Sequence, residues 1–187
     1  MNANPSDAEL LSRVAAQDRQ AIGPLYERFQ RRIFRYLVRM VKDEGMAEDL
    51  VNEVFLDVWR GAGRFEGRSS PSSWMFSIAH NKAVSALRRR REASLDEDDA
   101  AAIEDDAALP DQTVHEDDVR KMMRRYLDKL SPEHKAVIEL TYYQELSIKE
   151  IAEIVDCPEN TVKTRMFHAR KRLREMMGSR MSRENVS

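Results

Sequence analysis

The sequence predicts an all-α protein made of two small helical domains joined by a flexible acidic linker. Its 187 residues include only six Gly and six Pro, while hydrophobic residues make up 42% and charged residues 34% of the chain. This composition favours helices over turn-rich β-sheet folds. Apolar residues recur at the three- and four-residue spacing of amphipathic helices, and one acidic, Ala-rich stretch interrupts that spacing. The length suits one large domain or two small ones.

The first domain is predicted over residues 6–91. Ser6 and Glu9 have the spacing of a capping box, in which each side chain satisfies a free amide of the first helical turn. A second helix is expected to start near Pro24, because proline is tolerated in a first turn. The apolar residues expected to face the core from this second helix are Leu25, Tyr26, Phe29, Ile33, Leu37, Met40 and Val41.

Two more helices complete this domain. A third is expected over residues 46–60, followed by a Gly-rich loop over 61–69. A fourth should begin at Ser70-Pro71, a good cap and first position, and run to about Arg91. Their predicted core residues are Ala47, Leu50, Val51, Val54, Phe55 and Val58, then Met75, Ile78, Ala79, Ala83 and Ala86.

Residues 92–118 form the acidic stretch. They contain 12 acidic side chains and no Lys or Arg, with few large apolar groups, so they are expected to be a disordered linker. The rest of the chain carries 31 basic and 21 acidic side chains, a net charge of +10. Such basic domains suggest a polyanionic partner, although surface charge can also serve solubility alone. The acids could fold back on the basic domains or form only a solvated tether.

A second domain is predicted over residues 119–178, followed by a tail over 179–187. Within it, Ser131-Pro132 should start a helix, and Ser147 with Glu150 should form a second capping box. A tight break at Asp156-Cys157 then separates this short helix from a last helix that runs to about Met177. Short helix, break and long helix together predict a helix-turn-helix. The predicted core residues are Ile148, Ile151, Ala152 and Val155, then Val162, Met166, Ala169, Leu173 and Met176.

The outer face of the last helix has the chemistry of a DNA reader. Asn160, Thr164, Phe167 and Lys171 lie opposite the predicted core stripe, flanked by Lys163, His168 and Arg174. Asn can bond adenine through two contacts, Thr can bond a base edge, and Phe can touch a thymine methyl group. The alternative is an ordinary amphipathic helix with a solvated face.

A second basic cluster lies on the fourth helix. No acid occurs from Trp74 to Arg91, and Ser77, Asn81, Ser85 and Arg88 form a polar stripe opposite its predicted core face. Phe65 and Trp74, at the edges of the Gly-rich loop, could stack against an unpaired base. Taken alone, Trp74 could equally be a core residue and the Arg run a solvated helix end.

The third helix carries an apolar residue in a polar stripe. Opposite its core face lie Asp49, Asn52, Glu53, Leu56 and Arg60. A Leu surrounded by charge can anchor a protein interface, although single exposed Leu residues are also common.

Catalytic patterns are missing from the sequence. The four His residues and the single Cys lie far apart, and the sequence contains no phosphate-binding loop, nucleophile elbow or His-Glu-x-x-His motif. Each His is expected at the surface, with His80 and His168 as candidate DNA contacts. Cys157 could be a redox switch or a thiol packed at the turn. Together with the lack of an apolar run long enough to span a membrane, this predicts a cytoplasmic, non-enzymatic protein with no metal or cofactor.

Three segments resemble the extracytoplasmic-function (ECF) sigma factors of the bacterial sigma-70 family. Residues 47–59 (AEDLVNEVFLDVW) resemble the family's polymerase-binding segment, and residues 74–83 (WMFSIAHNKA) with Leu87-Arg88-Arg89 resemble its minus-10 recognition helix. Residues 147–154 and 160–170 resemble its minus-35 helix-turn-helix. The match runs in order from about residue 20 to 177. The chain departs from the family at Ser85, where Asp is frequent, and at Asn160, where Gly is frequent.

This resemblance implies a sigma factor that directs core RNA polymerase to promoters, in a stress or envelope response, and that an anti-sigma factor holds inactive. It implies contacts with the clamp of the polymerase β′ subunit and the flap of its β subunit, and with duplex and melted promoter DNA. The implied polymerase-binding residues are Asp49, Asn52, Glu53, Leu56 and Trp59. The implied minus-10 contacts are Arg64, Phe65, Trp74, Ser77, Asn81, Lys82, Ser85, Arg88 and Arg89. The implied minus-35 contacts are Asn160, Thr161, Lys163, Thr164, Arg165, Phe167, His168 and Lys171.

Two other classes of protein remain open on the residues alone. A conventional helix-turn-helix regulator would bind a palindromic operator tightly without polymerase. A pure interaction protein would titrate partners through the acidic stretch and would bind no specific DNA sequence.

Overall fold

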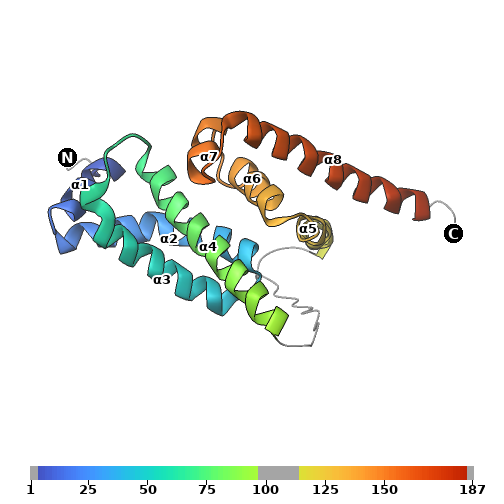
Figure 1. Cartoon of the computed structure of the whole chain (residues 1–187), viewed down its shortest axis with the longest axis horizontal. Coiled ribbons are helices and arrows are strands. Elements are labelled where there is room, and N and C mark those ends of the chain that lie inside the picture. The colour runs from blue at the N-terminus through green and yellow to red at the C-terminus, as the bar shows by residue number, and fades with distance from the viewer. Residues whose placement is uncertain (1–3, 97–113, 185–187) are drawn as a thin grey trace. The chain divides into compact units, whose positions relative to one another are not determined.

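The computed structural model describes residues 4–96 and 114–184, and throughout these ranges the chain is helical between short loops (Figure 1). The described residues form two compact units. The first contains α1 (Asp7–Ala15), α2 (Arg19–Val41), α3 (Glu44–Gly61), the 3-10 turn η1 (Ala62–Arg64) and α4 (Pro71–Asp96). The second contains α5 (Val114–Leu127), α6 (Pro132–Tyr142), most of α7 (Ile148–Ile154) and α8 (Glu159–Glu184). The predicted all-α fold with two helical domains is confirmed.

Helix α2 is the centre of the first unit, because α1, α3 and α4 all pack on it. Of the core residues predicted on α2 and α3, every one except Tyr26 is buried. Helix α4 presents mainly alanines to this core, so its backbone can approach its neighbours closely. The buried residues of α4 are Ser73, Met75, Phe76, Ala79, Ala83 and Ala86.

Some residues of the first unit differ from the predicted core. Tyr26 is 39% exposed and lies at the rim, with its ring 4.7 Å from that of Phe55. Ile78 is only half-buried, whereas Phe76, which the periodicity placed outside the core, is fully buried. The Phe76 ring packs edge-on against Tyr36 at 5.8 Å, and that aromatic contact with α2 shifts the buried face of α4 toward Phe76.

Helix α2 begins earlier than predicted. The helix starts at Arg19, where the Asp18 side chain accepts a hydrogen bond from the Gln20 amide at 2.9 Å, and Pro24 lies inside it. The prediction of a start near Pro24 was therefore wrong. A proline normally clashes with the Cβ of the preceding residue in a helix, but that residue is Gly23, which has no Cβ.

Both predicted capping boxes are present. In the first, the Ser6 amide donates to Glu9 at 2.6 Å and the Glu9 amide donates to the Ser6 hydroxyl at 3.2 Å. The bond from the Ser6 amide holds the pKa of Glu9 below its ordinary value. In the second, the matching distances between Ser147 and Glu150 are 2.9 Å and 3.3 Å. Local sequence therefore defines where α1 and α7 begin.

The second unit packs α6 and α8 together. From α8, Val162, Met166 and Ala169 are buried as predicted, while Leu173 and Met176 are half-buried. In α7 the buried residues are Ile151 and Ile154, and three of the four residues predicted to be buried there are only half-buried: Ile148, Ala152 and Val155. The unit also contains a charged pair at the edge of its core, since Lys135, 4% exposed, forms an ion pair with the half-buried Asp128.

The ends of the predicted linker and tail lie in helices. Helix α4 continues to Asp96 and α5 begins at Val114, so five residues at each end of the predicted 92–118 linker are helical. Residues 97–113 lie outside the described part of the chain. Helix α8 likewise continues to Glu184, into the predicted tail.

We expect a Glu145→Gly substitution to stabilise the protein. Glu145, exposed in the turn before α7, has a φ of 56°. This left-handed conformation costs an L-residue about 1–2 kcal/mol, while the added freedom of Gly in the unfolded chain removes about 0.5–1 kcal/mol of the gain. Thermal unfolding should show a higher midpoint for Glu145→Gly, by a few degrees, and no gain for Glu145→Ala. An equal gain from Ala would show that backbone strain at residue 145 is not the cause.

Candidate polymerase and promoter interfaces

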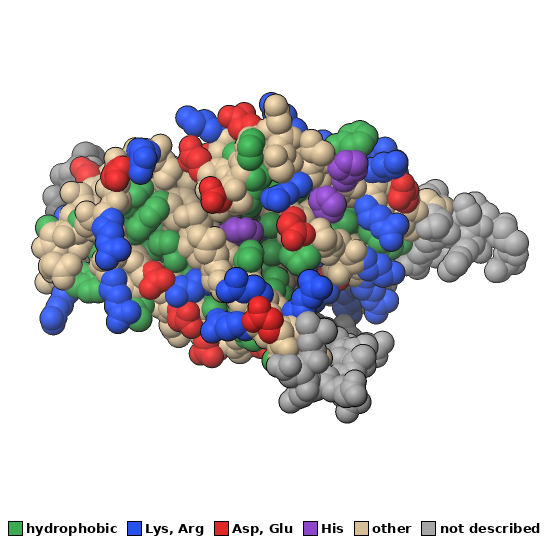
Figure 2. Space-filling view, viewed as in Figure 1, with side chains coloured by type: hydrophobic (Ala, Val, Ile, Leu, Met, Phe, Trp, Pro, Cys, Tyr) green, Lys and Arg blue, Asp and Glu red, His purple; other side chains and the backbone are tan. Residues whose placement is uncertain are grey.

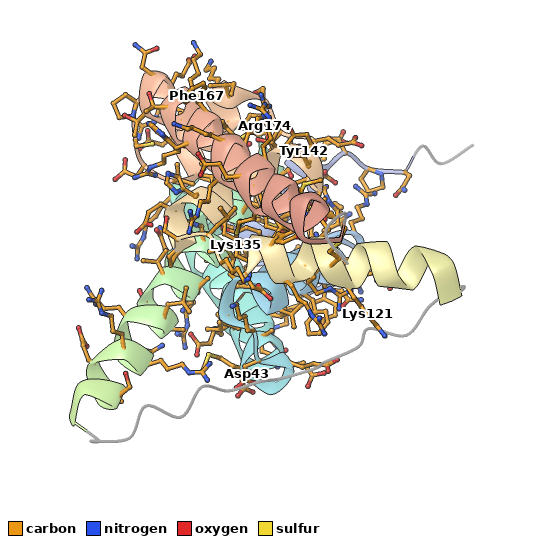
Figure 3. The ribbon with its side chains drawn as sticks, turned by 90° about the vertical axis from the view of Figure 1, so that its right-hand side faces the viewer. Asp43, Lys121, Lys135, Tyr142, Phe167 and Arg174 are labelled. Atoms are coloured by element: carbon orange, nitrogen blue, oxygen red, sulfur yellow. The ribbon has the colours of Figure 1, made fainter. Side chains whose placement is uncertain are left out.

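The outer face of α3 presents the stripe predicted to bind polymerase. Asp49, Asn52 and Glu53 are exposed, and Leu56 is 45% exposed among them. Trp59 is half-buried at the edge of the same face. The helix is fixed at its start by Asp43, whose side chain accepts a hydrogen bond from the Met46 amide at 2.8 Å (Figure 3). The structure thus brings these five predicted residues together on one helix face.

Lys82 joins this helix to α4. Its ammonium lies 3.0 Å from Glu53 and 2.9 Å from Asp57, both on α3. The hydrogen bond to Asp57 raises the pKa of Lys82 above the ordinary value of 10.5, and Glu53 acts in the same direction, against the effect of desolvation. Lys82 was predicted as a DNA contact, but in this structure its charge is paired with α3.

The outer face of α4 carries the rest of the predicted polar stripe. Asn81, Ser85, Arg88 and Arg89 are exposed, and Ser77 is half-buried with its hydroxyl donating to the Trp74 carbonyl at 2.7 Å. Arg88 also lies 3.8 Å from Glu92, a distance typical of a weak exposed pair. Figure 2 shows Lys and Arg side chains gathered near the C-terminal end of α4 and along α8.

The loop before α4 brings the two predicted stacking residues together. The rings of Phe65 and Trp74 lie 5.3 Å apart, and both side chains are half-buried. The indole ring of Trp74 packs against the end of α3, because a Cβ at Gly61 would lie 3.4 Å from it, an ordinary van der Waals contact. Arg64 is exposed beside them. The two aromatic rings form a half-open surface whose exposed edge suits an unpaired base.

Helix α8 presents its predicted DNA face to solvent. Phe167 is 64% exposed and points away from the helix (Figure 3), and the Thr164 hydroxyl donates to the Asn160 carbonyl at 2.9 Å. Of the eight predicted minus-35 contacts, six are exposed, whereas Thr161 and Arg165 are half-buried. The exposed six are Asn160, Lys163, Thr164, Phe167, His168 and Lys171.

The turn between α7 and α8 fixes the start of this face. Asp156 has a φ of 47°, and the next amide, that of Cys157, donates back to the Ala152 carbonyl at 3.1 Å. The half-buried Cys157 thiol accepts a hydrogen bond from Arg165 at 3.7 Å. Cys157 therefore packs against α8 at the turn, and Arg165 is turned toward the protein.

Comparison with known proteins identifies the family. Residues 25–93 match the family Sigma-70 region 2, and residues 120–173 match Sigma-70, region 4. The RNA polymerase sigma-H factor of Pseudomonas aeruginosa is 30% identical over 174 residues, which cover 88% of this chain and 90% of that protein. The ECF RNA polymerase sigma factor SigX of Bacillus subtilis is 34% identical over 159 residues, which cover 82% of this chain and 81% of that protein.

The chain belongs to the ECF sigma factors of the sigma-70 family. Sigma factors of this family are transcription initiation factors rather than enzymes. The solved sigma factor RpoE of Bartonella quintana, in complex with the anti-sigma factor NepR, matches with a TM-score of 0.71 and 26% identity, over 83% of this chain and 96% of that one. CnrH, solved with the cytosolic domain of CnrY, shares the fold with a TM-score of 0.71, 22% identity, and coverage of 94% and 99%.

Region 2 of this sigma factor contains a polar contact that periodicity did not predict. His80 was expected at the surface as a candidate DNA contact, but it is half-buried, and its Nδ1 lies 2.8 Å from the hydroxyl of buried Tyr36. The partner lies 44 residues away along the chain, so no local pattern could indicate it. His80 therefore helps to seat α4 on α2.

Region 4 contains an aromatic surface that sequence analysis also missed. Tyr142 and Tyr143 are 55% and 45% exposed at the end of α6, and the Arg170 guanidinium lies 5.6 Å from the centre of the Tyr142 ring. His134 and His168 lie with ring centres 6.4 Å apart on α6 and α8. In the sequence, two adjacent Tyr residues at the end of an apolar helix were the feature that could have indicated this surface.

Neither a metal site nor a membrane span emerges from the described ranges. Within residues 4–96 and 114–184, no three metal-ligating side chains gather in an arrangement suited to a metal ion. None of the described helices combines the length and apolar composition that a membrane crossing requires.

We expect Lys82→Met to lower the free energy of unfolding by up to about 1 kcal/mol, because its ion pairs are partly exposed to water. The folded-state pKa of Lys82 is raised, so the stabilisation is present below its ordinary pKa and is lost as pH rises through the raised value. Chemical unfolding measured from about pH 9 to about pH 12 should show that the wild type loses stability at high pH that Lys82→Met does not lose. Lys82→Arg should lose less, since Arg stays charged. If the stability of Lys82→Arg fell with rising pH as much as that of the wild type, the ion-pair assignment would be contradicted.

Proposed function

We propose that this protein is a dissociable initiation subunit that directs bacterial core RNA polymerase to specific promoters. The observation that carries the proposal is the placement of three helix faces, one predicted to bind polymerase and two predicted to bind promoter DNA. The polymerase-binding stripe of α3 and the minus-10 stripe of α4 lie on neighbouring helices of one unit, and α8 of the other unit carries the second DNA face. A stand-alone regulator needs only the last of these faces.

The polymerase contact centres on Leu56. An apolar side chain that is 45% exposed and surrounded by Asp49, Asn52 and Glu53 can enter an apolar pocket while the acids pair with basic residues at the rim. We assign this stripe to the clamp of the β′ subunit, and region 4 to the flap of the β subunit. Trp59, half-buried at the edge, would widen the contact.

The minus-10 element would meet region 2 as a melted strand. Phe65 and Trp74 offer the edge of an aromatic pair for stacking, and Arg64 lies exposed beside them for a phosphate. Asn81 and Ser85 then offer exposed polar groups to base edges along α4. Base extrusion costs a few kcal/mol, so a good match between promoter and these residues would determine which promoters open.

The minus-35 element would meet region 4 as duplex DNA. The first three turns of α8 present Asn160, Thr164 and Phe167 on one face, and the N-terminal part of a recognition helix reads base edges in the major groove. Lys163 and Lys171 flank them and suit phosphate contacts.

We also propose that an anti-sigma factor controls this protein in the cytoplasm, during a stress or envelope response. The Bartonella quintana relative was solved bound to an anti-sigma factor, and this chain keeps the same fold. We expect no enzymatic activity and no cofactor, because its candidate surfaces contain binding groups rather than a catalytic arrangement.

Run-off transcription with core RNA polymerase and a pooled genomic library tests the proposal. Discrete transcripts should require the protein and should disappear with Leu56→Glu, because a buried charge at the anchor disrupts docking. Met177→Glu is a matched control: Met177 is an apolar residue that is 39% exposed outside the predicted interfaces, and its variant should stay active. Tight operator binding without any new transcript would instead establish a conventional regulator.

A second test separates base reading from phosphate binding in region 4. Phe167→Ala should weaken binding to the selected promoter by about 1 kcal/mol or more and relax base preference, since it removes a contact with one base. Lys171→Ala should weaken binding to all sequences alike and make the salt dependence shallower by about 0.9. Titrations of duplex promoter and scrambled duplex at several salt concentrations measure both effects. A uniform loss for Phe167→Ala would remove it from the base contacts.

A further inference from the structure

The polar face of α4 is bordered by two helices of opposite charge. On the α3 side, Glu53 and Asp57 lie against α4 and pair with Lys82. Two acids sharing one cation leave this border with excess negative charge. A nucleic acid strand that contacts Asn81 and Ser85 would therefore be repelled on the α3 side.

The other border is formed by α2, which carries a stripe of arginines. Positions 28, 31, 32, 35 and 39 recur at three- and four-residue spacing, which places them on one side of the helix. Glu27 is the single acid in α2. This α2 arginine stripe consists of Arg28, Arg31, Arg32, Arg35 and Arg39.

Two contacts place the stripe beside the first half of α4. The Arg32 guanidinium lies 5.4 Å from the centre of the Phe76 ring, and one turn later Tyr36 bonds His80. Both pairs are 44 residues apart, so α2 and α4 run in the same direction and in fixed register. Arg31 and Arg35 are thus level with α4 residues 75–79, near the aromatic pair rather than the distal Arg88 end.

The members of the stripe differ in what already engages them. Arg28 is bound at 2.6 Å to both Asp7 and Asn4, and Arg32 stacks on Phe76. Arg31 and Arg35, in contrast, are exposed and form no ion pair with any residue in the described part of the chain. Their charges are one helical turn apart, and they are the two that a polyanion could engage without breaking an existing contact.

We propose that Arg31 and Arg35 bind the phosphate backbone of the melted promoter strand while its bases contact α4. This inference rests on the proposed function and extends the minus-10 interface from α4 onto α2. The acidic α3 border directs the strand toward the α2 side, and the two arginines then supply the cationic track that sequence-independent strand binding requires.

The chemistry of this surface favours DNA over a protein partner. Protein interfaces are anchored by buried apolar or aromatic side chains. The one large hydrophobic side chain of α2 that is exposed in the described structure is Tyr26, and its contact with Phe55 places it on the α3 side, away from the arginines. A cationic surface without an apolar anchor suits a phosphate backbone.

Salt-dependent binding of the full-length protein to a short, labelled, mixed-sequence single strand tests the inference without polymerase. Each lost phosphate contact makes the slope of log affinity against log salt shallower by about 0.7, so Arg31→Ala/Arg35→Ala should be shallower by about 1.4 and should bind several-fold more weakly at low salt. Arg31→Lys/Arg35→Lys should keep the wild-type slope, since it keeps both charges. Arg19→Ala, which removes an exposed arginine at the first residue of the same helix, should also keep it.

The outcomes separate this inference from the proposed function. A wild-type slope in Arg31→Ala/Arg35→Ala, with unchanged thermal unfolding, would overturn it, as would an equal change in Arg19→Ala. If Arg31→Ala/Arg35→Ala binds the strand normally but no longer binds core polymerase in a pull-down, the α2 arginine stripe contacts polymerase and the inference is also overturned. If Arg31→Ala/Arg35→Ala has the shallower slope but the wild-type protein supports no run-off transcription, the strand-binding surface is kept and the initiation function is rejected.

Discussion

The rotation of α4 about its own axis is the constraint on which the region 2 interface depends. That helix must present Asn81 and Ser85 to solvent, and its small buried alanines alone would allow it to roll. Two polar contacts on opposite flanks prevent this: the bond between His80 and Tyr36 on α2, and the ion pairs of Lys82 with α3. Each contact joins α4 to a neighbouring helix, so the position of the proposed promoter-binding face depends on residues of α2 and α3.

The same contacts tie the two predicted interfaces of region 2 together. Glu53 belongs to the polymerase-binding stripe and also holds Lys82, which lies next to Asn81 in the promoter-binding helix. Any polymerase residue that draws Glu53 away would leave Lys82 with Asp57 alone. The proposed polymerase contact of α3 and the proposed promoter contact of α4 are therefore physically connected through the ammonium group of Lys82.

Sequence patterns predicted the helices well because their signals are local. The capping boxes at Ser6 and Ser147 determine helix starts with residues three positions apart. The outer faces of α3 and α8 followed from periodicity, since a helical face is defined within a few turns. The start of α2 was missed because Gly23 makes Pro24 acceptable inside the helix, which the standard preference for first-turn proline does not anticipate.

Long-range partners were beyond the reach of those patterns. Lys82 lies in an acid-free basic segment and was predicted to bind DNA, yet its acids come from another helix. Phe76 was left out of the core because α4 alone does not show that Tyr36 of α2 packs against it. Such contacts decide which residues of a face can bind a ligand. The sequence therefore predicted which residues lie on a surface, but not which of them are already engaged by other parts of the protein.

The buried alanines of α4 have a consequence for how promoter preference can evolve. At Ala79, Ala83 and Ala86, only a methyl group separates the backbone of this helix from its neighbours. A larger residue at any of them would displace the helix by a fraction of its width and carry the whole reading face with it, since packed interiors offer no spare volume. If the outer face of α4 binds the promoter as proposed, substitutions hidden from solvent can thus change the geometry of base recognition while the exposed side chains stay the same.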